Sequence, residues 1–162
     1  MQSRSQQELR QTKPVASLEQ EASLSVERTA VVLRHELSEA LKPFGVTPTQ
    51  YNVLRILRGA GAEGLCRYEI GDRLVAQVPD VTRLLDRMEE AGLVTRARSA
   101  ADRRLVATRI TAEGLDLVEG IETPLAALHA RQFTRLSQGQ LRTLIGLLAL
   151  AREGDQRGAD PP

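Results

Sequence analysis

The chain has 162 residues, of which 41% are hydrophobic, and its formal net charge is +1. This length and apolar content predict a single domain of ordinary size. The longest apolar stretch, Leu144 to Ala151, is much shorter than the roughly 20 residues of a membrane span, and the polar start lacks an apolar signal-peptide core. The sequence therefore predicts a cytoplasmic protein with no membrane partner.

The residues that usually carry catalysis or bind metals are sparse. A single cysteine, Cys66, excludes an intramolecular disulfide and a cysteine metal cluster. The two histidines, His35 and His129, are far apart and have no neighbours at metal-ligand spacing. No nucleophile is paired with a base in the sequence. We therefore expect neither an enzyme nor a protein that holds a cofactor or a metal.

The two ends of the chain differ from its middle. Residues 1–16 are polar and have no apolar period, and residues 153–162 have the same character. Such segments are typical of disordered chain, because they cannot bury enough apolar surface to offset the loss of conformational entropy. We expect a disordered arm, a folded domain over residues 17–152, and a disordered tail.

Helical patterns begin directly after the arm. From Leu18 to Pro43, apolar residues recur every three or four positions, which predicts a long first helix. Thr47 and Gln50 then match a capping box with Pro48 at the first helical position. This pattern predicts a second helix from Thr47 to about Arg58.

Two shorter helices are expected next, at residues 67–74 and at about 78–91. The second of them has an apolar stripe, and Gly92 follows it as a C-terminal stop. Two short helices joined by a tight link form a helix-turn-helix. The stripe consists of Val81, Leu84, Leu85 and Met88.

The apolar period changes beyond Gly92. Residues 94–98 and 105–110 contain β-branched side chains and are separated by a polar turn, which predicts a β-hairpin, the wing. Thr111 is expected to cap a fifth helix that contains Pro124 and continues to about Leu136. A second capping box, at Ser137, predicts a sixth helix.

Arginines gather in the expected hairpin. Between Val94 and Arg109, five arginines stand against one acid, Asp102, in a chain that is otherwise nearly neutral. The alternative is a charged hairpin that is merely solvated. Because these arginines coincide with a helix-turn-helix, we interpret them as a surface that faces DNA phosphates.

Three motifs resemble the multiple-antibiotic-resistance regulator (MarR) family, over about residues 18–152. Asp102-x-Arg104, followed after five residues by Ile110-Thr111, matches the family's wing pattern with isoleucine in place of leucine. Residues 47–54 are similar to the family's second helix, and residues 82–94 are similar to its recognition helix.

The resemblance implies a mainly α fold with a small β-hairpin wing. In this winged helix-turn-helix, long terminal helices within residues 17–46 and 111–152 hold a homodimer, and residues 47–110 bind DNA. The fourth helix lies in the major groove and the wing tip at the minor groove. The implied function is sequence-specific recognition of double-stranded DNA by a transcription repressor that acts on a palindromic operator.

Candidate DNA contacts lie on the fourth helix and the wing. Arg83 can read guanine O6 and N7 bidentately. Asp80 could accept from a cytosine amino group, but we favour a role in satisfying backbone donors of the first turn. Gln77 stands where relatives often have serine or threonine, and Pro79 is expected inside the first turn. The expected DNA-binding residues are Gln77, Pro79, Asp80, Thr82, Arg83, Arg87, Arg96, Arg98, Asp102, Arg103 and Arg104.

A small-molecule effector is a further expectation from the resemblance, since some relatives bind anionic aromatic effectors where the first helix meets the second. Arg34, His35, Tyr51 and Arg55 are the residues expected to line such an effector pocket. His35 could instead be an ordinary surface or interface residue.

Three other interpretations stay open. Gly59-x-Gly61-x-x-Gly64 matches the dinucleotide-binding string, but a helix rather than a strand is expected before it, which favours a plain loop. Cys66 could make the regulator redox-responsive, although a structural role suits a small residue at that place better. The other class of function is a winged-helix module that binds protein partners, and DNA affinity that falls steeply with salt would distinguish the two.

Overall fold

The computed structural model describes residues 17–98 and 106–153. The chain divides into two units, one ending at Leu125 and the other beginning at Ala126. The expected arm and most of the expected tail lie outside the described residues. In the described part of the chain, no helix combines the length and the apolar character needed to cross a membrane.

The first unit begins with helix α2, Leu18–Leu41, which Ser17 caps by accepting a hydrogen bond from the backbone N–H of Gln20. A short 3-10 turn, η1 (Lys42–Phe44), follows it. Helix α3, Pro48–Ala60, starts with the expected capping box, in which Thr47 and Gln50 each accept from the other's backbone N–H. Local sequence chemistry therefore fixes both helix starts.

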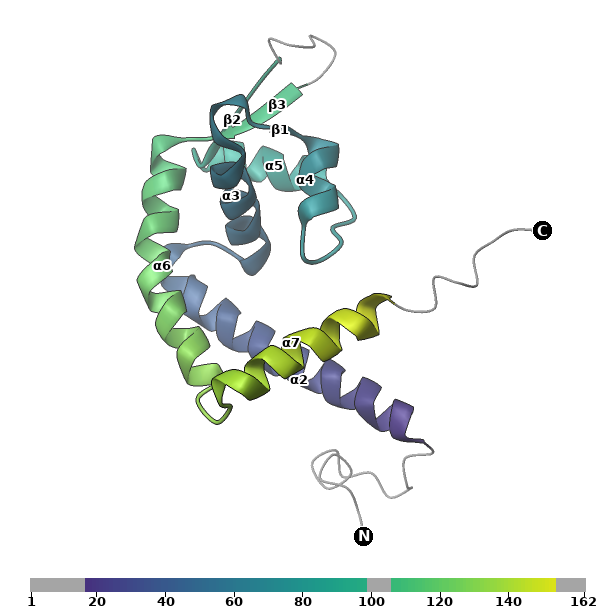
Figure 1. Cartoon of the computed structure of the whole chain (residues 1–162). Coiled ribbons are helices and arrows are strands. Elements are labelled where there is room, and N and C mark those ends of the chain that lie inside the picture. The colour runs from purple at the N-terminus through teal and green to yellow at the C-terminus, as the bar shows by residue number, and fades with distance from the viewer. Residues whose placement is uncertain (1–16, 99–105, 154–162) are drawn as a thin grey trace, which may run out of the picture. The chain divides into compact units, whose positions relative to one another are not determined.

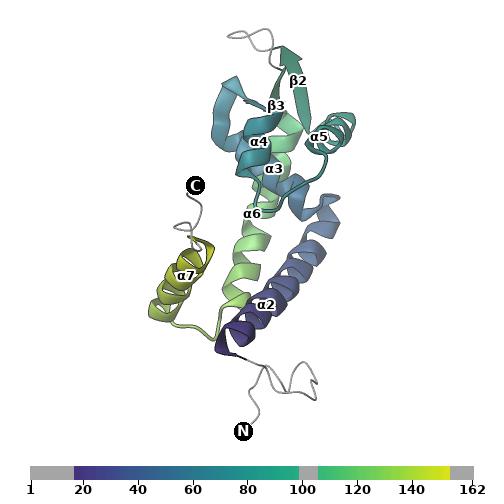
Figure 2. The same ribbon diagram turned by 90° about the vertical axis from the view of Figure 1, so that its right-hand side faces the viewer.

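Helices α3, α4 and α5 gather against a small sheet (Figure 1). Helix α4 spans Arg67–Arg73 and α5 spans Val81–Glu90. The sheet contains β1 (Leu65–Cys66), β2 (Val94–Arg98) and β3 (Val106–Ile110), all antiparallel, in the order β1-β3-β2. The hairpin of β2 and β3 confirms the expected wing, and Figure 2 shows it extending beyond the helices of this unit.

Strand β1 was not predicted, because only two residues pair and a glycine-rich segment precedes them. After the turn η2 (Gly61–Glu63), Leu65 pairs with Thr108 and Cys66 pairs with Ala107. Gly64 makes this pairing sterically feasible, since a Cβ at that position would lie 2.3 Å from the Thr108 carbonyl oxygen. The winged unit therefore has three strands rather than two.

One apolar core holds these elements together. Side chains of α3, α4 and α5 contribute to it along with residues of the sheet and of α6, Ala112–Gln132. The buried stripe of α5 confirms the expected one at three of its four positions, while Val81 is half-buried. The most deeply buried side chains include Leu41, Val53, Leu54, Leu57, Ile70, Leu85, Met88, Val94, Val118 and Ile121.

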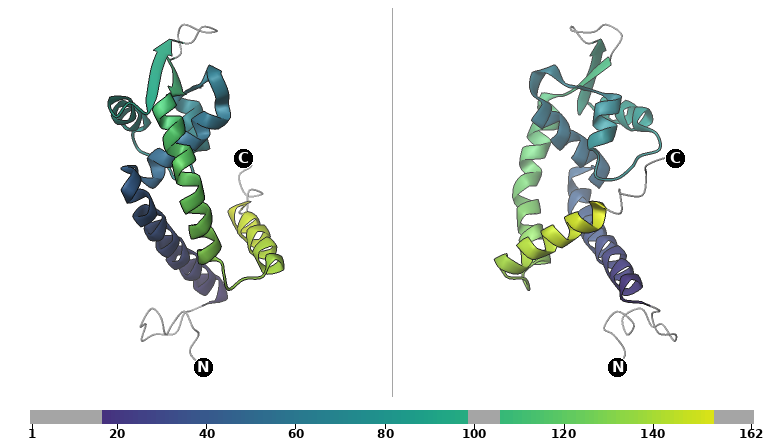
Figure 3. Two further views of the ribbon diagram at one scale, coloured as in Figure 1. Left: turned by 90° about the vertical axis from the view of Figure 1, so that its left-hand side faces the viewer. Right: turned by 45° about the vertical axis from the view of Figure 1, so that its right-hand side comes forward.

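Thr111 joins the wing to α6. Its hydroxyl donates to the Gly92 carbonyl at 2.7 Å and accepts from the Gly114 backbone N–H at 3.0 Å. Helix α6 contains Pro124, as expected, but ends at Gln132 rather than near Leu136, because the chain enters a turn there. Figure 3 gives two further views of the helix.

The second unit consists of the end of α6 and helix α7, Gln138–Glu153. The second capping box is present: the Gln140 side chain accepts from the Ser137 backbone N–H at 2.9 Å, and Ser137 Oγ accepts from the Gln140 N–H at 3.3 Å. Three large apolar side chains of α7, Ile145, Leu147 and Leu150, are exposed.

Candidate nucleic-acid interface

Helix α5 begins at Val81, three residues later than predicted, and Asp80 is its N-cap. The Asp80 carboxylate accepts from the Arg83 backbone N–H at 2.9 Å, which supports the capping interpretation of this acid. Pro79 therefore precedes the helix instead of lying inside its first turn. The error has a physical cause: apolar spacing locates the middle of a helix, whereas cap geometry locates its end.

The two faces of α5 differ sharply. Leu84, Leu85 and Met88 are buried against the rest of the unit. Thr82, Arg83 and Arg87 are exposed, as expected of residues that would reach DNA, and Arg87 Nε donates to the Arg83 carbonyl at 3.3 Å. A short helix that presents two arginines to solvent from a rigid apolar base suits insertion into a major groove.

The link between α4 and α5 is anchored to α3, and the two helices also contact each other. The Val75 backbone N–H donates to Asn52 Oδ1 of α3 at 3.0 Å, and Gln77 lies exposed farther along the link. Arg67, at the start of α4, donates to Thr82 Oγ1 of α5 at 3.3 Å. These contacts hold the helix-turn-helix as one body.

Arg67 and Tyr68 are exposed residues at this surface that the sequence motifs did not indicate. The Arg67 guanidinium lies 4.4 Å from the centre of the Tyr68 ring and donates to the Tyr68 hydroxyl. Tyr68 is 63% exposed. The only sequence signal for this pair is an arginine and an aromatic residue together at the start of a helix-turn-helix.

The structure places Arg96 in an intramolecular ion pair. Its Nε donates to Glu89 Oε2 at 2.9 Å, and its Nη2 lies 2.7 Å from Glu89 Oε2 and 2.5 Å from Asp86 Oδ1. The Arg96 backbone N–H also donates to Glu89 Oε1 at 2.9 Å. Because Arg96 is engaged with two acids of α5, its expected role as a phosphate contact loses support.

Both partners of this ion pair are electrostatically perturbed. The hydrogen bonds from Arg96 lower the pKa of the Glu89 carboxyl, with a smaller opposing effect from desolvation and from the neighbouring Asp86. The same bond to Glu89 raises the pKa of Arg96 above its usual range. Glu89 and Arg96 therefore stay charged at neutral pH, and their ion pair holds β2 against α5.

The remaining arginines of the wing differ in their surroundings. Arg98 is exposed at the end of β2, as a phosphate contact requires. Arg109 donates through Nε to the Ala62 carbonyl at 2.7 Å, so it braces the η2 turn. Asp102, Arg103 and Arg104 lie outside the described residues. The basic surface of the described hairpin is thus smaller than the number of arginines in the sequence indicated.

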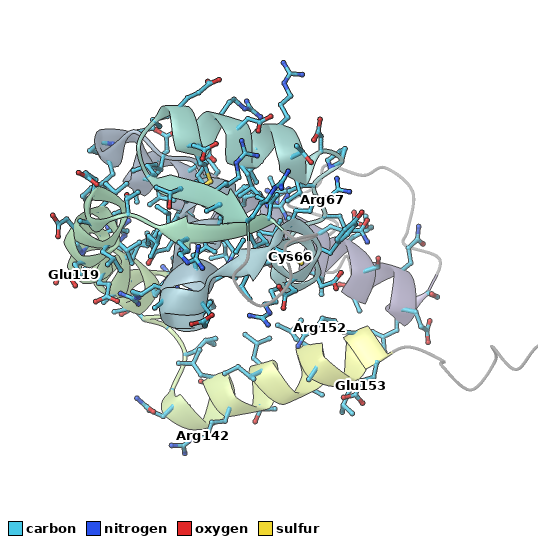
Figure 4. The ribbon with its side chains drawn as sticks, turned by 90° about the horizontal axis from the view of Figure 1, so that it is seen from above. Cys66, Arg67, Glu119, Arg142, Arg152 and Glu153 are labelled. Atoms are coloured by element: carbon cyan, nitrogen blue, oxygen red, sulfur yellow. The ribbon has the colours of Figure 1, made fainter. Side chains whose placement is uncertain are left out.

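The glycine string precedes the short strand β1, and Cys66 ends that strand. Gly59 lies within α3, and Gly64 precedes β1, so the string follows a helix, as expected for a plain loop. Cys66, labelled in Figure 4, is half-buried where β1 meets α4. Its backbone N–H donates to Glu69 Oε2 at 2.8 Å. This bond is the main cause of a lowered pKa at Glu69.

A pocket of about 450 Å³ opens between the sheet and helices α4 and α5. Cys66, Arg67 and Tyr68 line one part of it, and Thr82, Leu85 and Arg96 line another, with Val106 and Thr108 from β3. This pocket is distinct in position from the expected effector residues.

The four expected effector residues are only partly brought together. Arg55 lies 6.0 Å from the centre of the buried Tyr51 ring within α3, whereas Arg34 and His35 are exposed on α2. Helices α2 and α3 pack against each other. Within the described residues, no group of three His, Cys, Asp or Glu side chains could hold a metal ion.

Comparison with known proteins supplies the identity of this fold. Residues 44–105 match the sequence model of the MarR family. An HTH-type transcriptional repressor of Mycobacterium tuberculosis is 32% identical over 115 residues, which cover 71% of this chain and 81% of that protein. The repressor MdtR of Bacillus subtilis is 28% identical over 148 residues, covering 90% and 94% of the two chains.

Solved structures agree with the sequence comparisons. A MarR transcription factor from Planctomyces limnophilus is 39% identical, with a TM-score of 0.64, and the match covers 84% of this chain and 98% of that one. A mutant MarR from E. coli, complexed with operator DNA, is 25% identical with a TM-score of 0.74, covering 84% and 99%. This chain therefore belongs to the MarR family of winged-helix transcription regulators.

Proposed function

We propose that this protein is a sequence-specific repressor that binds double-stranded DNA as a homodimer on a palindromic operator. The observation that carries the proposal is α5: it exposes Thr82, Arg83 and Arg87 on one face and buries Leu84, Leu85 and Met88 on the other. The operator complex of the E. coli relative supports the same use of the fold, and the relatives named as repressors support the direction of regulation.

Exposed apolar residues support the homodimer. Val31 on α2 is 68% exposed, and Ile145 and Leu150 on α7 are each 66% exposed. Soluble proteins seldom leave large apolar side chains in water without a partner, and a two-fold axis would let two copies of the chain bury these side chains against each other. Sedimentation equilibrium should give twice the chain mass of 17.8 kDa at micromolar concentration. A monomer would remove the basis for palindromic recognition.

DNA selection tests recognition directly. Duplexes recovered from a random library should share inverted half-sites whose centres are about one helical turn, roughly 34 to 36 Å, apart. Affinity for the selected duplex should fall steeply with salt, because phosphate neutralisation releases counterions. A protein that enriches no sequence, and whose DNA binding is indifferent to salt, would favour the alternative class, a module that binds protein partners.

The wing motif supports a minor-groove contact. Arg104 matches the arginine that related proteins insert into the minor groove, where a narrow A·T-rich groove concentrates negative potential. Asp102 would then position the hairpin rather than face the phosphates. Replacing Asp102 with alanine should weaken operator binding, although simple electrostatics predicts that removal of an acid tightens it.

Release by a small anionic aromatic effector is the remaining part of the proposal. The guanidinium of Arg55 over the Tyr51 ring supports it, because that pair offers a cation beside an apolar wall. Titration of benzoate-type acids against the DNA complex should lower affinity in the wild type, and less in Arg55→Gln. An equal response in both proteins would remove Arg55 from the effector site.

A further inference from the structure

We propose that Arg96 is a positioning residue: it fixes the wing relative to helix α5, and discrimination of the operator depends on it although it makes no contact with DNA. The inference rests on the proposed function, since it concerns how the two DNA-reading elements are held together. It starts from the four bonds that join Arg96 to Asp86 and Glu89.

The ion pair connects strand β2 of the wing to helix α5, and apolar packing holds these two elements together along only part of their length. At the root of β2, Val94 is buried in the core, with 1% of its surface exposed. Farther along the strand, Arg96 and the α5 residues Thr82 and Leu85 line the same pocket of about 450 Å³. The hydrogen bonds of Arg96 therefore act where van der Waals contact between the wing and the recognition helix is incomplete.

The Glu89 carboxylate binds both the backbone and the side chain of Arg96 in β2. One carboxylate oxygen, Oε1, accepts from the Arg96 backbone N–H at 2.9 Å. The other, Oε2, accepts from the guanidinium nitrogens Nε at 2.9 Å and Nη2 at 2.7 Å. Asp86, one helical turn before Glu89, accepts from the same guanidinium nitrogen. The bonds from Asp86 and Glu89 to the backbone and side chain of Arg96 therefore resist both sliding and rotation of the hairpin relative to α5.

Engagement of Arg96 also makes it a poor phosphate ligand. Its side chain is only 24% exposed, and both of its partners are carboxylates that would be left unpaired if the guanidinium turned towards DNA. Charge-assisted bonds of this kind are short and strong, so an incoming phosphate would have to replace two of them at once. The charge of the arginine is thus engaged by the two acids of the recognition helix.

A fixed wing matters for specific binding more than for non-specific binding. Base readout by α5 and groove contact by the wing must occur together on the operator, so a loose hairpin adds an entropic cost to that complex. Non-specific binding uses phosphates alone and tolerates a mobile wing. Loss of the positioning contact should therefore lower the ratio of the two affinities.

The experiment measures two dissociation constants for each protein over a range of salt concentrations. One probe is the tightest duplex that the wild type selects from a random library, and the other is a mixed-sequence duplex of equal length. The variants are Arg96→Gln, Glu89→Gln and the matched control Arg98→Gln, which removes the same charge two residues along the same strand. Arg96→Lys keeps the charge without the bidentate fork.

We expect Arg96→Gln and Glu89→Gln to weaken binding of the selected duplex about tenfold, in line with coupling within one ion-pair network, and to change mixed-sequence binding less than about twofold. The salt slope should not change in Arg96→Gln, whereas Arg98→Gln should reduce it by about 0.9 for each phosphate that is no longer neutralised. Arg96→Lys should restore part of the affinity. Glu89→Gln is the sharpest variant, because removal of an acid would tighten DNA binding if only net charge mattered.

Three results would overturn the inference: equal losses on both duplexes in Arg96→Gln, a reduced salt slope in that variant, or tighter operator binding by Glu89→Gln. Amide hydrogen exchange gives a readout without DNA, since the Arg96 N–H should exchange faster in Glu89→Gln and not in Arg98→Gln. If the wild type selects no duplex, the proposed function fails, and the exchange result alone then decides whether Glu89 holds the wing.

Discussion

Replacing Gly59, Gly61 and Gly64 with alanine, one at a time, should change the stability of the protein in three different ways, although these glycines form one sequence motif. Gly59 lies in α3 at negative φ, and a Cβ there would meet no atom within 4 Å. Gly61 has φ 68° and ψ −155° and is equally open. Gly64 has φ 70° and ψ −169°, but its Cβ would lie 2.3 Å from the Thr108 carbonyl oxygen.

The magnitudes follow from these geometries. Alanine at position 59 should stabilise the protein by about 0.5 kcal/mol, because glycine near a helix end costs backbone entropy. Alanine at position 61 should cost roughly 1 to 3 kcal/mol for a backbone region that is essentially restricted to glycine. Alanine at position 64 adds the overlap with β3, for roughly 1 to 3 kcal/mol more.

Urea denaturation of the three variants, followed by circular dichroism, measures each free energy of unfolding. The difference between Gly64→Ala and Gly61→Ala isolates the contact of Gly64 with Thr108, because both variants bear the same backbone cost. A Gly64→Ala protein no less stable than Gly61→Ala would refute the close approach of this turn to β3. A phosphate-binding motif predicts a different pattern, in which all three changes abolish nucleotide binding.

Further substitutions test the interface and the packing behind it. Arg83→Ala should reduce discrimination at one base pair in each half-site by about 1 to 3 kcal/mol, and a uniform loss on all sequences in a competition assay would make Arg83 an anchor instead. Since Arg96 lowers the pKa of Glu89, the contribution of this carboxylate to stability is complete above the ordinary value of about 4.3 and is lost as the pH falls through the lower folded value, so the Tm difference between wild type and Glu89→Gln should be constant above about pH 4.3 and shrink progressively as the pH is lowered further. Alanine normally strengthens a helix, but Gly114→Ala should destabilise the protein by roughly 1 to 3 kcal/mol, because its Cβ would lie 2.4 Å from the Leu93 carbonyl oxygen, and an unchanged Tm would contradict that contact.

The sequence predicts helices best where two kinds of signal agree. At Thr47 and Gln50, cap chemistry and apolar spacing both mark the start of a helix, and the structure confirms it. At α5 three of the four predicted stripe positions are buried, but the helix begins at Val81 because Asp80, and not a residue nearer Val78, provides the cap. An aspartate directly before the first residue of the apolar stripe is a local N-cap signal that could have placed this boundary.

Long-range pairing is harder to predict than local pattern. The two residues of β1 have no strand signature of their own, and they pair with β3 only because Gly64 lets the backbone approach. In the same way, the number of arginines could not separate Arg98, which is exposed, from Arg96, whose partners lie on another element. The placement of arginines along the sequence predicted a basic wing, whereas the role of each arginine depends on tertiary contacts.

Asp80 offers a final test, because it combines an unfavourable charge with a favourable cap at the surface expected to face DNA. Its carboxylate accepts from the Arg83 backbone N–H at 2.9 Å and thereby satisfies one donor of the first turn of α5. Asparagine can make the same cap without the charge, whereas alanine removes both. Asp80→Asn should therefore keep the stability of the wild type and bind all duplexes more tightly, by an amount that shrinks as salt rises.

Alanine separates the two roles of this residue. Asp80→Ala should lose about 1 kcal/mol of stability and, because a frayed first turn no longer places Arg83, should bind the selected duplex more weakly than Asp80→Asn although both variants carry the same charge. If Asp80→Asn instead lost discrimination while keeping its stability, the carboxylate would be reading a cytosine amino group directly. The cap would then be the lesser of its two functions.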